Sequence, residues 1–279
     1  MSVMERELLT ISIVTYRLDA SMFAQALRHL HVAVSHLAQH SLAQNRTATV
    51  RLSIIDNGAD ADMLRELVNR SGLADMADII STGRNLGYGK AHNLAITTTT
   101  ATYHLVMNPD VLVAEDALVA AVNFLDAHPQ VAALSPHAVN GAGRPAYLCK
   151  RYPALLDLAL RGFAPGTLKQ RFGARLDSYE NRALVAREQP AEVDLISGCF
   201  MFCRAQALQQ AGGFNPGYFL YFEDFSLSLE LRKCGSLMYV PACRIVHYGG
   251  NAGKKGLRHV LHFIASAFRF YNQYGWKLL

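Results

Sequence analysis

Short apolar runs that end in polar residues alternate with helical segments in the first part of the chain. The runs lie at residues 10–15, 50–55 and 103–107 and are rich in β-branched residues. Between them, apolar residues recur at the three- and four-residue spacing of a helix, for example at Phe23, Leu27 and Leu30. Strands that alternate with helices pair into a parallel sheet with crossover helices. The sequence therefore predicts an α/β fold.

Each of the three runs ends in polar or glycine-containing sequence. In open α/β sheets the ligand binds beyond the carboxyl ends of the strands, where such residues lie together. One ligand site is thus predicted at the three ends, which are Thr15-Tyr16, Asp56-Asn57-Gly58 and Asn108-Pro109-Asp110.

Composition and charge limit the kind of protein and partner. The chain has 279 residues, 51% of them hydrophobic, which is enough for one large domain or two fused lobes. Its net charge of +5 suits a nucleotide diphosphate or an anionic membrane surface, and also fits an ordinary, slightly basic surface. Outside the C-terminal tail, Lys and Arg are dispersed, so no nucleic-acid partner is expected.

The cysteines and apolar stretches bear on location. Five cysteines without a CxxC pair or metal-finger spacing fit reduced thiols in the cytosol. The first nine residues include acids and lack a long apolar run, so they do not read as a secretory signal. No run of 18 or more apolar residues occurs, so no membrane span is expected. We expect a cytoplasmic protein that at most attaches to the inner face of the cytoplasmic membrane.

The second half is predicted from shorter patterns. We expect helices over 115–128, 205–211 and 225–233, strands over 194–204 and 237–240, and loops or short helices over 141–190.

The tail, residues 254–279, is predicted to form a basic, aromatic helix. Its apolar residues recur on one face, and they are Leu257, Leu261, Ile264, Phe268 and Tyr271. Basic residues and Trp276 accompany this face, namely Lys254, Lys255, Arg258, Arg269 and Lys277. Such a helix suits an anionic membrane surface. The alternative is that it packs on the domain or on a second copy of the chain in a homodimer.

Two carboxylates follow the predicted strands. Asp56 can accept hydrogen bonds from the imide of a uracil or thymine ring, or from a ribose hydroxyl. The alternative is an Asp-Asn-Gly turn that caps its own backbone. Asp110 can hold a hard divalent cation that also contacts two phosphates, with water in the remaining positions. The alternative there is a plain polar turn.

A glycine-rich segment, Gly83 to Lys90, precedes a predicted helix. Its spacing does not match GxGxxG and it does not follow the first strand, which argues against a nicotinamide dehydrogenase. It is interpreted as a loop close to a nucleotide, with Arg84 or Lys90 near phosphate, or as a structural turn.

The most specific feature is Glu223-Asp224, which directly follows the aromatic run 218–222. Aromatic neighbours desolvate a carboxylate and raise its basicity, as a general base for a sugar hydroxyl requires. The alternative is that Asp224 caps the helix that follows. His247 is a candidate metal ligand or phosphate contact, or a structural histidine.

In order, these segments resemble the family-2 inverting glycosyltransferases with a GT-A fold, and within them the bacterial rhamnosyltransferases of O-antigen and cell-wall assembly. The resemblance covers residues 11–250. It is carried by eight elements, which are Ile11 to Tyr16, Ile55 to Gly58, Asn85 to Gly89 with Asn93, Asn108 to Asp110, Ser197 to Met201, Gly212 to Phe214, Tyr218 to Asp224 and His247 to Gly250.

The resemblance implies a single GT-A domain over residues 1–250, with a mixed, mainly parallel sheet. A nucleotide-sugar-binding half (1–114) precedes an acceptor-binding half (115–250), and the tail follows. It implies that Asp224 is the catalytic base, that Glu223 and Tyr221 face the acceptor, and that Asp110, in place of the usual DxD motif, holds Mg²⁺ or Mn²⁺ with His247. Residues expected at the donor nucleotide are Thr15, Tyr16, Asp56, Asn57, Arg84, Asn85, Gly87, Asn93 and Asn108.

The expected reaction transfers a sugar, L-rhamnose from dTDP-rhamnose in the first instance, onto a saccharide carried by a polyprenyl diphosphate. A UDP-hexose is the alternative donor. Two residues depart from the family pattern: Ser226 replaces the second acid of Glu-Asp-x-Asp, and Asn215 replaces the usual Asp after Gly-Gly-Phe. The rival interpretation is therefore a sugar-nucleotide-binding protein with a weakened site.

Overall fold

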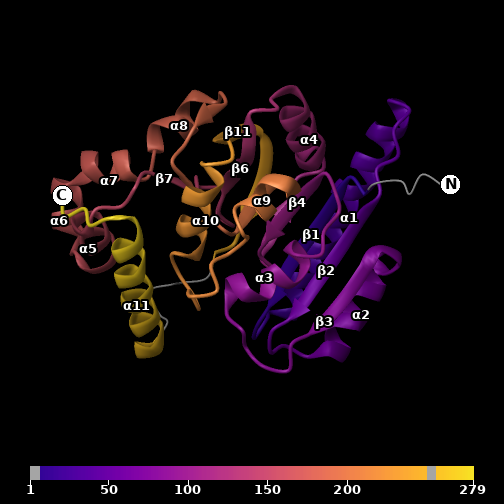
Figure 1. Ribbon diagram of the computed structural model, residues 1–279, viewed down its shortest axis with the longest axis horizontal. Helices are drawn as coiled ribbons and strands as arrows, with labels where there is room; N and C mark the ends of the chain where they lie inside the picture. Colours follow the sequence, from indigo (N-terminus) through magenta and orange to yellow (C-terminus); the bar gives the residue numbers. More distant parts are fainter. Residues whose placement is uncertain (1–6, 250–255) are drawn as a thin grey trace.

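A nine-stranded sheet forms the centre of the computed structural model, which describes residues 7–249 and 256–279 (Figure 1). The strand order is β3-β2-β1-β4-β10-β6-β11-β5, with β8 paired beside β11. Strands β1 to β4 are mutually parallel, β6 is parallel to β11, and β10, β5 and β8 are antiparallel to their neighbours. The strands are β1 (Leu9–Thr15), β2 (Val50–Asp56), β3 (Ala77–Ser81), β4 (Tyr103–Met107), β5 (Val111–Val113), β6 (Val131–Val139), β8 (Ala191–Glu192), β10 (Phe200–Arg204) and β11 (Ser236–His247).

Helices cover both faces of this sheet, and a second group of helices lies to one side of it. In Figure 1 the short helices α5 to α8 and the C-terminal helix α11 gather at one end of the molecule. A small sheet of β7 (Cys149–Lys150) and β9 (Leu195–Ile196) connects that group to the rest. The helices are α1 (Ala20–Ala43), α2 (Ala61–Ser71), α3 (Tyr88–Ile96), α4 (Ala117–Ala127), α5 (Leu155–Phe163), α6 (Gly166–Arg171), α7 (Gly173–Tyr179), α8 (Arg182–Arg187), α9 (Ala205–Gln210), α10 (Glu223–Leu231) and α11 (Leu257–Tyr274), with a 3₁₀ turn at Ala74–Met76.

The alternation of side chains along the central strands produces a core on each face. Ile11 and Ile13 of β1 belong to the same cluster as Leu27 of α1, whereas Val14 belongs with Ala91 of α3. All seven residues of β1 are buried, as expected for a central strand covered on both faces. The sheet therefore fixes the carboxyl ends of β1, β2 and β4 at one edge.

A row of buried polar side chains crosses the sheet beneath α3. Ser12 bridges the rings of His92 and His104, at 2.7 and 2.9 Å, and Thr10 lies 2.8 Å from the other nitrogen of His104. Burial lowers the pKa of His104 to about 3 and also lowers that of His92, so both rings are neutral. These two imidazoles therefore have a structural role: they link α3 and β4 to β1 through hydrogen bonds.

The predicted strands at the start of the chain are confirmed, and two later ones need correction. The strand predicted over 194–204 is interrupted at Ser197-Gly198, so β9 joins the small sheet while β10 joins the main one. The strand predicted over 237–240 is twelve residues long, with an irregularity between Val240 and Arg244. Pro241 lies in this irregularity, where its missing N–H is tolerated. Strands β3, β5, β6, β7 and β8 were not predicted. The segment 141–190, predicted as loops or short helices, contains the four short helices α5 to α8.

The start of α10 also differs from the prediction. The helix begins at Glu223, and its N-cap is Phe222, which has φ of +62° and no side-chain capping bond. Asp224 therefore lies in the first helical turn. The alternative that it caps this helix is wrong, and its carboxylate is available for other contacts.

Candidate active site

Asp56 closes a turn at the carboxyl end of β2. Its Oδ1 accepts hydrogen bonds from the backbone N–H of Gly58 (3.1 Å) and Ala59 (2.8 Å), and its Oδ2 accepts one from the Ser81 hydroxyl (3.3 Å). Oδ1 of Asp56 therefore caps the Asp-Asn-Gly turn, as the alternative interpretation predicted. The carboxylate remains partly exposed at the edge of the sheet, where it can also meet a ligand.

Asn57 holds the glycine-rich loop against the end of β2. Its amide donates to Asn85 Oδ1 (2.9 Å) and to the Gly87 carbonyl (3.2 Å), and its Oδ1 accepts from the Leu86 N–H (2.7 Å). Gly87 has φ of +83°, and a Cβ there would lie 2.4 Å from the Phe219 carbonyl oxygen. Only glycine fits this position, so the loop can touch the segment that leads to Glu223.

The other expected donor residues divide into two groups. Thr15 is buried and its hydroxyl donates to the Ile55 carbonyl (3.2 Å). Asn93 donates to the Phe214 carbonyl (2.7 Å) and accepts from its N–H (2.9 Å). These two side chains bind the protein itself, whereas Tyr16 and Arg84 are exposed at the same edge of the sheet and accessible to a ligand.

A chain of contacts joins Asp224 to the end of β4. Asp224 Oδ2 accepts from the Gly198 N–H (3.0 Å), and Oδ1 accepts from the N–H of Phe225 (2.9 Å). The Tyr88 hydroxyl lies 2.6 Å from the Gly198 carbonyl and 2.9 Å from Asn108 Oδ1, and its one proton serves either acceptor. The candidate base is thus connected to the segment that carries Asp110.

Gly198 and Tyr88 are functional candidates that were not predicted from the sequence. A Cβ at Gly198 would lie 3.2 Å from the Asp224 Cβ and 3.3 Å from Tyr88 Cε1, so the glycine is fitted between the two side chains. Both residues occur in the motifs that carry the family resemblance. Their contact with Asp224 depends on tertiary packing, for which the sequence holds no local signal.

The two adjacent acids have different environments. Glu223 is buried, 5% exposed, and its Oε2 has no hydrogen-bond partner within the part of the chain that the structure describes. Burial and the neighbouring Asp224 charge raise the pKa of Glu223 to about 8. Burial also raises the pKa of Asp224, but the N–H groups of Gly198 and Phe225 oppose that rise. Asp224 is partly exposed, so it is the acid that a substrate can reach.

Asp110 and His247 meet where β11 pairs with β5. The His247 Nε2 lies 3.5 Å from Asp110 Oδ1, and the Tyr248 N–H donates to the Asp110 carbonyl (3.1 Å). Burial lowers the pKa of His247, but the Cys199 thiol and Asp110 outweigh it and raise the pKa to about 10. Over residues 7–249 and 256–279, no three His, Cys, Asp or Glu side chains form a metal-ligating group. One carboxylate and one imidazole, the latter after release of its proton, fit a cation whose remaining ligands come from substrate and water.

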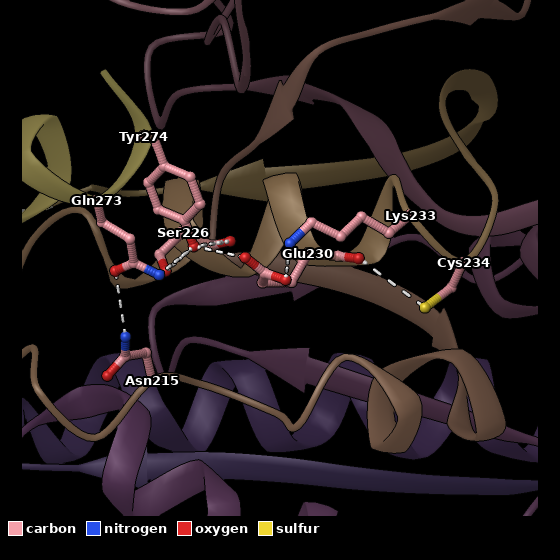
Figure 2. Close-up of polar contacts among 7 residues, drawn as sticks. All are labelled: Asn215, Ser226, Glu230, Lys233, Cys234, Gln273 and Tyr274. Atoms are coloured by element: carbon pink, nitrogen blue, oxygen red, sulfur yellow. Dashed lines mark hydrogen bonds and ion pairs between the residues drawn. The ribbon is translucent and has the colours of Figure 1, made fainter. Parts of the chain in front are cut away.

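Both departures from the family pattern contact the end of α11 (Figure 2). Ser226 Oγ lies 2.9 Å from the Tyr274 hydroxyl, which donates to Glu230 Oε1 (2.9 Å). Gln273 donates to the same hydroxyl (2.9 Å) and accepts from Asn215 Nδ2 (3.4 Å). An acid at position 226 would place a buried carboxylate beside the partly exposed carboxylate of Glu230. Ser226 therefore favours the packing of α11 against α10.

We expect Tyr274→Phe to lower the free energy of unfolding by about 1–2 kcal/mol, because it leaves the buried Ser226 hydroxyl without this partner. Urea denaturation checks this, with Tyr248→Phe as the control because that ring is 42% exposed. Equal stability of the two variants would contradict the structural role of the hydroxyl.

The C-terminal helix packs against the aromatic segment that precedes Glu223 and Asp224. Tyr221 contacts His259 (3.1 Å), Phe219 stacks on His262 with ring centroids 4.7 Å apart, and Phe270 is buried against Phe222. The predicted apolar face needs correction, because Tyr271 is buried while Leu261, Ile264 and Phe268 are 57%, 56% and 59% exposed. The helix both packs on the domain and exposes a second apolar stripe. Lys254 and Lys255 lie outside the described residues, as does Gly250.

The sequence matches the family model described as glycosyl transferase family 2 over residues 37–210, more than half of the chain. Solved glycosyltransferases share the fold. GalNAc-T7 with UDP, GalNAc and Mn²⁺ superposes with a TM-score of 0.64 at 13% identity, covering 96% of this chain and 48% of that structure. The mannosyltransferase PcManGT from Pyrobaculum calidifontis, in complex with GDP-Man and Mn²⁺, has a TM-score of 0.57 at 16% identity, covering 95% and 65%. This chain thus spans about half the length of the first structure.

The chain belongs to glycosyl transferase family 2, and its α/β architecture is the GT-A fold. Two relatives are similar over most of their length. The N-acetylglucosaminyl-diphospho-decaprenol L-rhamnosyltransferase of Mycobacterium tuberculosis is 28% identical over 249 residues, 84% of this chain and 78% of the relative. The rhamnosyltransferase WbbL of Escherichia coli (strain K12) is 25% identical over 228 residues, 78% of each. The expectation of a glycosyltransferase is confirmed.

Proposed function

We propose that this enzyme transfers L-rhamnose from dTDP-rhamnose to a hydroxyl of a saccharide carried on a polyprenyl diphosphate, with inversion, in surface polysaccharide biosynthesis. The two similar relatives, both rhamnosyltransferases, support the donor and the acceptor. A UDP-hexose is the alternative donor. The observation that carries the catalytic part is the reachable Asp224 carboxylate, held by the Gly198 N–H and linked through Tyr88 to the Asp110 segment.

In the proposed reaction Asp224 removes the proton from the acceptor hydroxyl, whose oxygen attacks the anomeric carbon of the donor. The bond to the nucleoside diphosphate breaks on the opposite side, so the anomeric configuration inverts and no covalent enzyme intermediate forms. Gly198 orients the base through its N–H, and Glu223 supports the acceptor side. Tyr16, Asp56 and Arg84 are proposed to bind the nucleotide at the edge of the sheet, while Asn57 and Asn85 keep the loop in place.

Asp110 and His247 are the residues proposed to hold the divalent cation. When bound, Mg²⁺ or Mn²⁺ supplies charge neutralisation for the diphosphate that leaves. Two solved neighbours that share the fold contain Mn²⁺, which supports a cation in this enzyme.

A donor panel tests the proposed function. Release of nucleoside diphosphate is followed with dTDP-rhamnose and with UDP-hexoses, each with and without a lipid-linked saccharide acceptor. Acceptor-dependent release from dTDP-rhamnose is expected. Binding of the donor without transfer or hydrolysis would instead support the rival, a sugar-nucleotide-binding protein with a weakened site.

We also propose that the exposed stripe of α11 rests on an anionic membrane, which places the protein peripherally on the cytoplasmic face. No helix in the described part of the chain is long and apolar enough to span a bilayer. The stripe consists of Leu261, Ile264 and Phe268, and exposed Arg258, Trp276 and Lys277 accompany it. Apolar side chains beside basic and interfacial aromatic ones are typical of helices that lie in a membrane interface.

Replacing Leu261, Ile264 and Phe268 together by Ser is expected to abolish most co-sedimentation with vesicles that contain anionic lipids, because the inserted apolar area is lost. The native fold is retained, since the buried residues Phe270 and Tyr271 are untouched. The matched control replaces Val32 and Leu42, exposed apolar residues of α1, by Ser. Equal binding of both variants would remove the membrane proposal, and a concentration-dependent change in mass for the native chain alone would assign the stripe to a homodimer.

A further inference from the structure

One segment of the chain has an excess of basic over acidic residues. Residues 150–188 contain eight Lys or Arg and four Asp or Glu, a net charge of +4 out of +5 for the whole chain. The segment forms α5 to α8, which lie at the same end of the molecule as α11 (Figure 1). Leu155 and Leu158 of α5 belong to the cluster around Phe222 and Phe270, so this charge borders the acceptor side.

Glu180 lies at the centre of a cationic cluster in this segment. Its Oε1 is 3.5 Å from Lys150 Nζ and 3.4 Å from Arg161 Nε, and its Oε2 is 2.7 Å from Arg182 Nη2. One carboxylate therefore serves three cations, and Arg182 has a second partner in Asp177 at 2.9 Å. Lys150 is 7% exposed, whereas Arg161 is 54% exposed. Arg161 can thus bind a further anion.

Tyr179 adds a buried hydroxyl to the same cluster. The residue is 3% exposed, and its hydroxyl has no hydrogen-bond partner among residues 7–249 and 256–279. Its backbone is fixed, because the Tyr179 carbonyl accepts from the Arg151 N–H (2.9 Å), and the Lys150 ammonium lies 5.8 Å from the centroid of its ring. A buried hydroxyl without a partner is costly, so a ligand oxygen at this place would be stabilised.

The cluster is adjacent to the candidate base. Lys150 pairs with Leu195 across the small sheet, and the chain continues from β9 to Gly198, which donates to Asp224. Burial raises the pKa of Asp224, and the Arg161 charge opposes that rise. Burial also raises the pKa of Tyr179, and the Asp224 charge adds to it. The cluster and the base thus lie within electrostatic reach of each other.

We propose that Arg161 and Tyr179, backed by Lys150, form a subsite for an anionic group carried by the acceptor, namely the diphosphate that joins the acceptor sugar to its lipid. This rests on the proposed function and extends it from the reacting hydroxyl to the other end of the sugar. In such an acceptor one sugar ring separates that hydroxyl from the diphosphate. The mycobacterial relative is named for an N-acetylglucosaminyl-diphospho-decaprenol substrate, which carries such a diphosphate.

The geometry separates this subsite from the donor diphosphate. The residues proposed for the donor side, Asp110 and His247, lie where β5 pairs with β11 and connect to Asp224 through Asn108 and Tyr88. The cationic cluster reaches Asp224 through β7 and β9 instead. The two anionic groups would therefore occupy separate places, each connected to Asp224 through different strands.

Kinetics with two acceptors test the subsite. One acceptor is a short-chain N-acetylglucosaminyl diphospholipid, and the other is the neutral octyl glycoside of the same sugar. Arg161→Gln is expected to raise KM for the diphospholipid by about 10–100-fold, the range of a charge-assisted hydrogen bond, and to affect the neutral glycoside at least about tenfold less. Tyr179→Phe, which removes one atom and no existing hydrogen bond, is expected to show the same preference with a smaller factor.

The control is Arg171→Gln, which removes the same charge from an exposed position in the same segment and should leave both KM values unchanged. Equal losses with the two acceptors, or a parallel rise in the donor dissociation constant, would overturn the subsite. Absence of transfer by the native enzyme to either acceptor would instead overturn the proposed function. The effect of Arg161→Gln should also shrink in high salt, because Arg161 is partly exposed.

Discussion

Asp224→Asn is expected to lower kcat by about 10²–10⁴-fold while donor affinity hardly changes. Asparagine keeps the shape and can still accept the Gly198 N–H, but it cannot take a proton from the acceptor hydroxyl. Initial rates of nucleoside diphosphate release give kcat, and calorimetric titration gives the donor dissociation constant.

Burial raises the pKa of Asp224. As the pH is lowered, the native enzyme should therefore lose activity at a higher pH than it would with a base of ordinary aspartate pKa. The base is active only when ionised, so kcat falls as the pH drops through that raised pKa. A pH–rate profile that is flat down to the usual range of an aspartic acid would contradict this assignment.

Asp110→Ala is expected to abolish turnover and to remove most of the donor affinity, since the diphosphate then keeps its charge uncompensated. The native enzyme should likewise need added Mg²⁺ or Mn²⁺ and lose activity in EDTA. Only His247 would remain as a proposed protein ligand of the cation in this variant. Activity assays over a range of cation concentrations check both expectations.

Asp116→Ala is the matched control, because Asp116 is an exposed carboxylate close in sequence and its side chain does not cap α4. It should retain the cation dependence of the native enzyme. Full activity of Asp110→Ala in EDTA would show that this carboxylate holds no cation needed for the reaction.

Three central strands of the fold and the edge that carries the site were predictable from local pattern. Strands β1 and β4 are buried along their whole length, β1 and β2 are rich in β-branched residues, and polar residues follow all three strands. The rule that strand ends gather at one edge then brought Asp56 and Asp110 to the same side of the sheet. The order of the motifs predicted the family, and the match to the model of glycosyl transferase family 2 confirms it.

The rest depends on contacts that are distant in sequence. Tyr88 meets Gly198 across 110 residues, and Ser226 meets Tyr274 across 48, so neither pairing leaves a periodic trace. The tail showed one apolar face in sequence but has two in the structure, because Phe270 and Tyr271 follow each other and both turn to the core. The cluster around Glu180 was hidden for the same reason, since its members come from β7, α5, α7 and α8.

The central claim is that Asp224, and not its neighbour Glu223, accepts the proton. Glu223 is buried, and burial together with the Asp224 charge raises its pKa to about 8, which favours its protonated form, whereas Asp224 is partly exposed and within reach of a substrate. The most direct measurement is the paired determination of kcat, acceptor KM and donor affinity for Asp224→Asn and Glu223→Gln. The account predicts a collapse of kcat for Asp224→Asn, and for Glu223→Gln a weakened acceptor affinity with chemistry largely kept. Near-native kcat for Asp224→Asn, or an inactive Glu223→Gln with normal folding, would show that the wrong carboxylate has been assigned.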